Sequence, residues 1–132
     1  PEFELYVTPI NIDPEKPAMP ISHPNVFSTY LAKRQGAFAT LGIPEDSWAL
    51  NEKILSDQDF IRQSMDADTE RRKMFFDALD KTKRGLCVCV FDGTDRIQHT
   101  FWRDIDKQHP SHEPARSAQQ PNAIEAVYRR MD

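Results

Sequence analysis

The sequence predicts an α/β fold with several helices and few strands. Two short runs, residues 4–10 and 86–91, are rich in β-branched and aromatic residues and have the length of strands. The segments between and after them repeat apolar residues at the three- to four-residue spacing of amphipathic helices. A chain of 132 residues is one domain's worth of sequence and can bury a modest core.

Composition excludes two classes of partner. The mean hydropathy is -0.67, and no apolar run approaches the roughly 20 residues that a membrane span needs. The net charge is -4, with acidic and basic residues mixed along the chain, so no basic patch for nucleic acid is expected. The compartment is left open, although two thiols in an apolar run slightly favour a reducing cytoplasm.

The positions of proline and glycine predict the secondary structure of the first 36 residues. The strand over residues 4–10 contains Pro9, which gives it an edge or irregular character. The proline-rich stretch over residues 11–24 is predicted to be an extended loop. A helix is predicted to start at Pro24, and Gly36 is its predicted stop.

Two further helices are expected in the middle of the chain. One should begin near Pro44, with acidic residues in its first turn, and continue through Ile54. The residues from Ser56 to Asp59 have the outline of a capping box, which predicts a third and longer helix. The charged stretch over residues 66–73 is predicted to be a solvated part of that helix.

The strand over residues 86–91 carries both cysteines. Residues two apart on a strand share a face, so Cys87 and Cys89 should lie together. Such a pair can bind a metal or cycle between redox states, but two small buried hydrophobic side chains are the favoured interpretation. Two cysteines cannot form a disulfide framework.

The end of the chain is predicted to be a polar loop followed by a helix. Residues 107–122 are polar and proline-rich, and the histidines at 109 and 112 are expected to be solvated there. From residue 123 the apolar residues fall on one helix face, and no stop signal follows. The chain is therefore expected to be an internal segment of a longer protein, residues 1–132 forming a single partial domain. A natural C-terminal helix is the alternative.

The residues after the second strand point to metal chemistry. Asp95 should fall in the first turn of a helix and His99 four residues later, on the same face. A carboxylate and an imidazole that converge in this way can hold Zn²⁺, and Mn²⁺ remains possible. A carboxylate favoured by the helix dipole, or a simple hydrogen bond between the two side chains, would give the same spacing.

Three neighbours of this pair have alternative roles. Asp92 is either a group that orients His99 or a turn former. Thr94 is expected to cap the helix and not to act as a nucleophile, because no base lies near it. Arg96 can meet a substrate phosphate, but a solvated or ion-paired guanidinium is favoured.

The stretch over residues 91–103, Phe-Asp-Gly-Thr-Asp-Arg-Ile-Gln-His-Thr-Phe-Trp-Arg, resembles the metal-site motif of type I phosphodiesterase/nucleotide pyrophosphatase-like proteins of the alkaline phosphatase superfamily. The similarity extends through residues 39–52 and 74–81. The resemblance implies a fragment of an alkaline phosphatase-like sheet with flanking helices. It also implies that Asp95 and His99 bind one ion of a two-metal site, with the third ligand expected beyond residue 132.

The resemblance further implies a metal-dependent phosphoric ester hydrolase whose small-molecule substrate is a phosphate ester or nucleotide. Two metal ions would clamp an in-line displacement at phosphorus by a Thr or Ser nucleophile expected before residue 1. The isolated chain is therefore expected to be inactive. A sulfatase or phosphomutase relative and a non-catalytic interaction module are the alternatives. Strands left unpaired in such a fragment would invite homo-oligomerisation.

Overall fold

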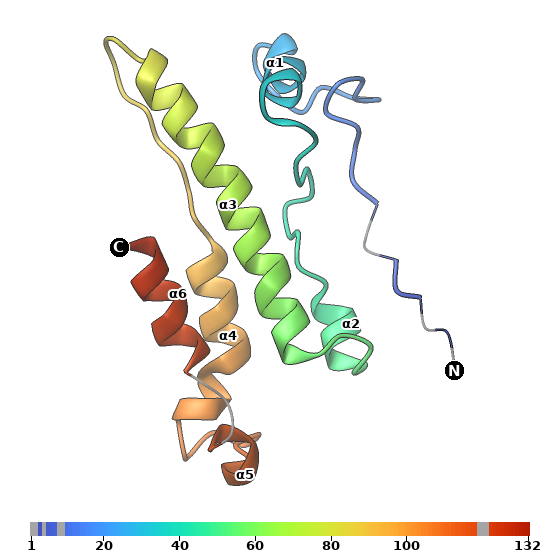
Figure 1. Ribbon diagram of the computed structural model, residues 1–132, viewed down its shortest axis with the longest axis vertical. Helices are drawn as coiled ribbons and strands as arrows, with labels where there is room; N and C mark the ends of the chain where they lie inside the picture. Colours follow the sequence, from blue (N-terminus) through green and yellow to red (C-terminus); the bar gives the residue numbers. More distant parts are fainter. Residues whose placement is uncertain (1–2, 4, 8–9, 119–121) are drawn as a thin grey trace. The chain divides into compact units, whose positions relative to one another are not determined.

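The computed structural model describes residues 3, 5–7, 10–118 and 122–132, and Figure 1 shows these residues as helices joined by coil. Neither the described residues of 4–10 nor residues 86–91 form a strand, and residues 4, 8 and 9 lie outside the described part. The predicted α/β fold, with its alkaline phosphatase-like sheet, is therefore wrong for this structure. A strand is stable only when neighbours complete its ladder of hydrogen bonds, and the other described segments are helices and loops.

The chain divides into two compact units, Pro1–Cys89 and Val90–Asp132. The first unit contains α1 (Val26–Gln35), α2 (Ser47–Asn51) and α3 (Asp57–Lys81). The second contains α4 (Gly93–Ile105), α5 (Pro114–Ser117) and α6 (Ala123–Met131). The helices predicted from the N-terminal, middle and C-terminal apolar patterns are thus confirmed in position.

Helix α1 ends as the sequence predicts. Gly36 has a φ of 90°, a conformation that side chains with a Cβ rarely adopt, and its N–H donates to the carbonyl of Ala32 at 2.8 Å. The following helix, α2, is shorter than predicted. Asp46 caps it by accepting from the N–H of Ala49 at 2.9 Å, but it ends at Asn51, and Ile54 lies in the turn beyond.

The N-terminus of α3 confirms the predicted capping box. Ser56 Oγ accepts from the N–H of Asp59 at 3.1 Å and donates to the Asp59 carboxylate at 2.6 Å. The prediction that residues 66–73 are solvated is wrong in part. Asp68 is only 6% exposed, and Glu70 accepts from the N–H of Ala39 at 2.8 Å, so this charged stretch holds the preceding loop against the helix.

One carboxylate joins α1 to α3. Asp77 on α3 accepts from the Tyr30 hydroxyl at 3.1 Å and pairs with the Arg34 guanidinium, both on α1. Lys81, one turn further along α3, pairs with Asp77 and lies 5.5 Å from the centre of the Tyr30 ring. These partners hold the pKa of the Asp77 carboxyl below its usual value, Lys81 being the largest cause.

The second unit is a helical hairpin with a small apolar core. Helix α6 lies beside α4 and runs antiparallel to it (Figure 1). Ile97 and Phe101 of α4 and Val127 of α6 are buried, with exposed fractions of 0%, 1% and 2%. Gln98 donates to the Tyr128 hydroxyl at 2.6 Å. The predicted apolar face of α6 is therefore confirmed as the face that packs on α4.

Candidate metal centre

Asp95 and His99 lie one turn apart on α4, as the sequence predicts. His99 Nε2 and Asp95 Oδ1 are 3.3 Å apart. Their side chains are 80% and 63% exposed, so both hydrophilic groups point into solvent, on the part of α4 that α6 does not bury. The structure thus brings together the two predicted ligands and leaves them accessible to an ion.

The separation of these two atoms fits a bound ion. Zinc bonds to nitrogen and oxygen are about 2.0–2.2 Å, so two ligands at a tetrahedral angle are about 3.3–3.5 Å apart. Ligands at the right angle of an octahedral site would be about 3.0 Å apart for similar bond lengths. The observed 3.3 Å matches the tetrahedral arrangement, and it also lies within the range of a long imidazole–carboxylate contact.

The surroundings of the pair form a shallow hollow lined by Gln98, Trp102 and His109. His109 comes from the loop after α4, and its Nδ1 accepts from the N–H of Ser111 at 3.1 Å. Within the described part of the chain, no three His, Cys, Asp or Glu side chains converge on one point where a metal ion would be held. Asp95 and His99 are thus the two candidate ligands that the described residues bring together at this hollow.

The other predicted site residues lie at the start of α4. Asp92 occupies the N-cap position, seven residues before His99, which is about 10 Å along the helix axis. The prediction that Thr94 caps the helix is wrong, because α4 begins at Gly93 and Thr94 is its second residue. Arg96 is half-buried, and its Nε has no hydrogen-bond partner among the described residues.

The sequence analysis missed the role of His112. Its Nδ1 lies 2.7 Å from the carbonyl oxygen of Arg103 in the last turn of α4. The Nδ1–H of His112 donates to this carbonyl in the way that side chains near the C-terminus of a helix cap its last turn. A histidine a few residues after a helix end is the signal that predicts such a cap.

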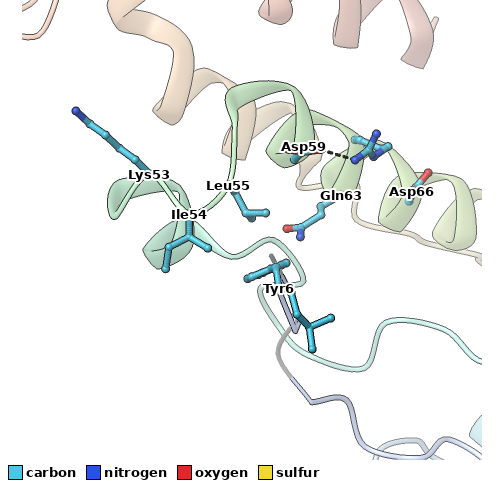
Figure 2. Close-up of a pocket in the computed structure, with 9 residues that line it drawn as sticks. Tyr6, Lys53, Ile54, Leu55, Asp59, Gln63 and Asp66 are labelled. Atoms are coloured by element: carbon cyan, nitrogen blue, oxygen red, sulfur yellow. Dashed lines mark hydrogen bonds and ion pairs between the residues drawn. The ribbon is translucent and has the colours of Figure 1, made fainter. Parts of the chain in front are cut away.

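A second hollow, of about 810 Å³, lies in the first unit (Figure 2). Figure 2 shows Asp59, Gln63 and Asp66 along one side of α3, with Ile54 in the turn after α2. Tyr6 completes the lining, and its hydroxyl donates to Asp46 at 2.8 Å. No periodic pattern in the sequence predicts this hollow, because it joins an irregular N-terminal segment to two helices.

The pKa values of Tyr6 and of its hydrogen-bond partner Asp46 are both shifted. Burial raises the pKa of the Tyr6 hydroxyl, and its hydrogen bond to Asp46 raises it further. The N–H of Ala49 and the Tyr6 hydroxyl together hold the pKa of the Asp46 carboxyl below its usual value. The hydrogen bond between these two groups joins the N-terminal segment to the N-cap of α2, so they have a structural role.

Comparison with known proteins finds no relative of this chain. The chain matches no protein-family model, no curated protein and no solved structure. None of the helices in the described residues combines the length and the apolar character needed to cross a bilayer. The hypothesis that Asp95 and His99 bind a metal ion therefore rests on the geometry of these two side chains and on the resemblance of residues 91–103.

Proposed function

We propose that Asp95 and His99 are two ligands of one divalent metal ion in a phosphoric ester hydrolase of phosphodiesterase or nucleotide pyrophosphatase type, of which this chain is a segment. The observation that carries the proposal is the 3.3 Å approach of two exposed side chains of complementary ligand type. The resemblance of residues 91–103 supplies the reaction class.

The ligand set favours zinc. Imidazole nitrogen and carboxylate oxygen both suit Zn²⁺, and the separation of the two atoms matches tetrahedral geometry. Mn²⁺ is the second choice, since it accepts the same ligands with octahedral geometry. Two such ions in the parent enzyme would stabilise the attacking and leaving oxygens of a displacement at phosphorus.

The residues of this chain contribute ion binding. Asp95 supplies a negative charge, and the rigid helix fixes its position relative to the His99 imidazole. The nucleophile and the remaining ligands belong to other segments of the parent, so the isolated chain binds metal weakly and does not turn over substrate. A sulfatase or phosphomutase relative would use the same pair.

Metal binding by the chain itself can be measured at single nitrogens. We expect titration with Zn²⁺ to shift the ¹⁵N resonance of His99 Nε2 and to leave His23, in the other unit, unshifted. Asp95→Asn should weaken the His99 response, whereas His23→Ala, in the other unit, should preserve it. A response that is unchanged in Asp95→Asn would overturn the shared site.

Activity is tested in the parent enzyme. Asp95→Ala and His99→Ala should each lower metal-dependent hydrolysis of a chromogenic phosphodiester by more than the roughly 10–100-fold that loss of an outer-shell contact costs. Glu125→Gln, on the exposed face of α6, is the control. An active parent that tolerates both changes rules out the metal role. A parent inert toward phosphodiesters, phosphomonoesters and sulfate esters would favour the interaction module.

A further inference from the structure

A further side chain of ligand type lines the hollow around the proposed metal ligands. The residues that line this hollow are Asp95, Gln98, His99, Trp102 and His109. The indole N–H of Trp102 only donates, and the side-chain amide of Gln98 donates to the Tyr128 hydroxyl at 2.6 Å. His109 is therefore the residue of this hollow that can add an imidazole nitrogen to the pair.

The backbone of His109 is held close to the end of α4. Its N–H donates to the carbonyl of Asp106 at 3.0 Å, and its carbonyl accepts from the N–H of His112 at 2.9 Å. His112 is itself tied to α4 through the 2.7 Å contact between its Nδ1 and the carbonyl oxygen of Arg103. Rotation about the two side-chain torsions of His109 is the movement that these backbone bonds leave open.

The imidazole of His109 is held in one protonation state by a backbone group. Its Nδ1 accepts from the N–H of Ser111 at 3.1 Å. A backbone N–H can only donate, so Nδ1 carries the lone pair and, in the neutral ring, Nε2 carries the proton. In this structure His109, Asp95 and His99, all within the described part of the chain, do not converge on one point. Ligation by His109 therefore requires its ring to turn away from Ser111.

We propose that His109 is the third ligand of the ion held by Asp95 and His99, and that its ring exchanges the hydrogen bond from Ser111 for the bond to the metal. The inference rests on the proposed function and changes it in one respect, since one of the remaining ligands then comes from this chain. The resemblance of residues 91–103 implies a third ligand beyond residue 132 instead. Two imidazoles and one carboxylate form a ligand set that catalytic zinc sites use, with the fourth position open for water or substrate.

Ligation by His109 breaks its bond from Ser111 whichever ring nitrogen binds the ion. If Nδ1 binds, the lone pair that accepts from Ser111 is given to the metal. If Nε2 binds, the neutral ring carries its proton on Nδ1, and two N–H groups would face each other. The Ser111 N–H therefore reports ligation by His109 independently of ligation by His99.

Nuclear magnetic resonance of the full chain during titration with Zn²⁺ tests this exchange. We expect the ring nitrogens of His109 and His99 to respond with the same midpoint, and the amide proton of Ser111 to shift as it loses its acceptor. The amide of His112 is the control within the loop, because it donates to the His109 carbonyl and not to the ring. A response of His99 without a change at His109 and Ser111 would overturn the third ligand and leave the proposed pair intact. A titration without any response at His99 would overturn both.

Removal of the imidazole tests its contribution to the affinity for the ion. His109→Ala should raise the dissociation constant for Zn²⁺ at least about tenfold, since even the loss of an outer-shell partner costs roughly 10–100-fold. His23→Ala, in the other unit, is the matched control and should leave the constant unchanged. A dissociation constant that is the same in His109→Ala and in the unmodified chain would refute the proposal.

X-ray absorption at the zinc edge counts the imidazoles directly. We expect two imidazoles for each zinc ion in the unmodified chain and one in His109→Ala, with the carboxylate of Asp95 bound in both. A single imidazole at zinc in the unmodified chain, or two that persist in His109→Ala, would show that His109 is not a ligand.

Discussion

Replacing Phe101 with alanine would remove the largest buried side chain of the unit built from α4, α5 and α6. Phe101 is 1% exposed, and among the described residues of that unit only Ile97 and Val127 are comparably buried apolar residues. Truncation of a buried Phe to Ala typically costs about 3–5 kcal/mol, since it removes apolar contacts and leaves a cavity. A unit of this size, Val90–Asp132, has a total stability of about 2–6 kcal/mol. The loss is therefore comparable with the whole stability of the hairpin.

Amide hydrogen exchange followed residue by residue is the suitable assay, because it separates the two units. We expect Phe101→Ala to abolish protection in α4 and α6 and to leave α3 protected. Phe76→Ala is the matched control, since Phe76 is 52% exposed on α3 and should lose much less. Retained protection of α4 and α6 in Phe101→Ala would refute the view that three side chains hold the hairpin together.

Two further predictions concern the first unit. Ser56→Ala should lower the free energy of unfolding by about 1 kcal/mol, because the N–H of Asp59 loses its capping acceptor. Urea denaturation followed by circular dichroism measures this change, and an unchanged free energy of unfolding would show that the cap is unimportant. The lowered pKa values of Asp46 and Asp77 mean that their stabilisation is complete above about pH 4 and is lost as the pH falls through those lowered values. Thermal unfolding measured between pH 5 and 2 should show this loss as a falling melting temperature. In Asp46→Asn, which keeps a capping side chain, the melting temperature should depend less on pH. An unchanged pH profile in that variant would contradict the assignment to Asp46.

The helices could be predicted from the sequence because their signals are local. Gly36 ends α1 and Ser56 begins α3 through contacts within one turn, and the sequence shows both partners of each contact. The Asp95–His99 pair was predictable for the same reason, since helix geometry alone brings residues four apart together.

The two predicted strands are wrong because a strand needs a hydrogen-bonding partner elsewhere in the chain, which a local run of residues does not reveal. Residues 86–91 have strong β propensity, yet the described part of the chain supplies no ladder for them. The burial of Asp68 was missed for a related reason, because it depends on tertiary contacts that a residue's own spacing does not reveal. The early end of α2 is local, since Lys53 has a φ of 59° and the N–H of Ile54 turns back to the carbonyl of Ala49.

Charge contributes to the contact between α1 and α3, since Asp77, whose side chain is 10% exposed, gathers Arg34, Lys81 and the Tyr30 hydroxyl around one carboxylate. The contact between α4 and α6 is held by apolar side chains. Dissolved ions screen the first kind of contact within about 10 Å at 0.1 M, whereas excluded salts such as sulfate strengthen the second. A concentrated sulfate solution should therefore weaken the ion pairs of Asp77 and strengthen the packing of α6 on α4, so the same salt acts in opposite directions on these two sets of contacts.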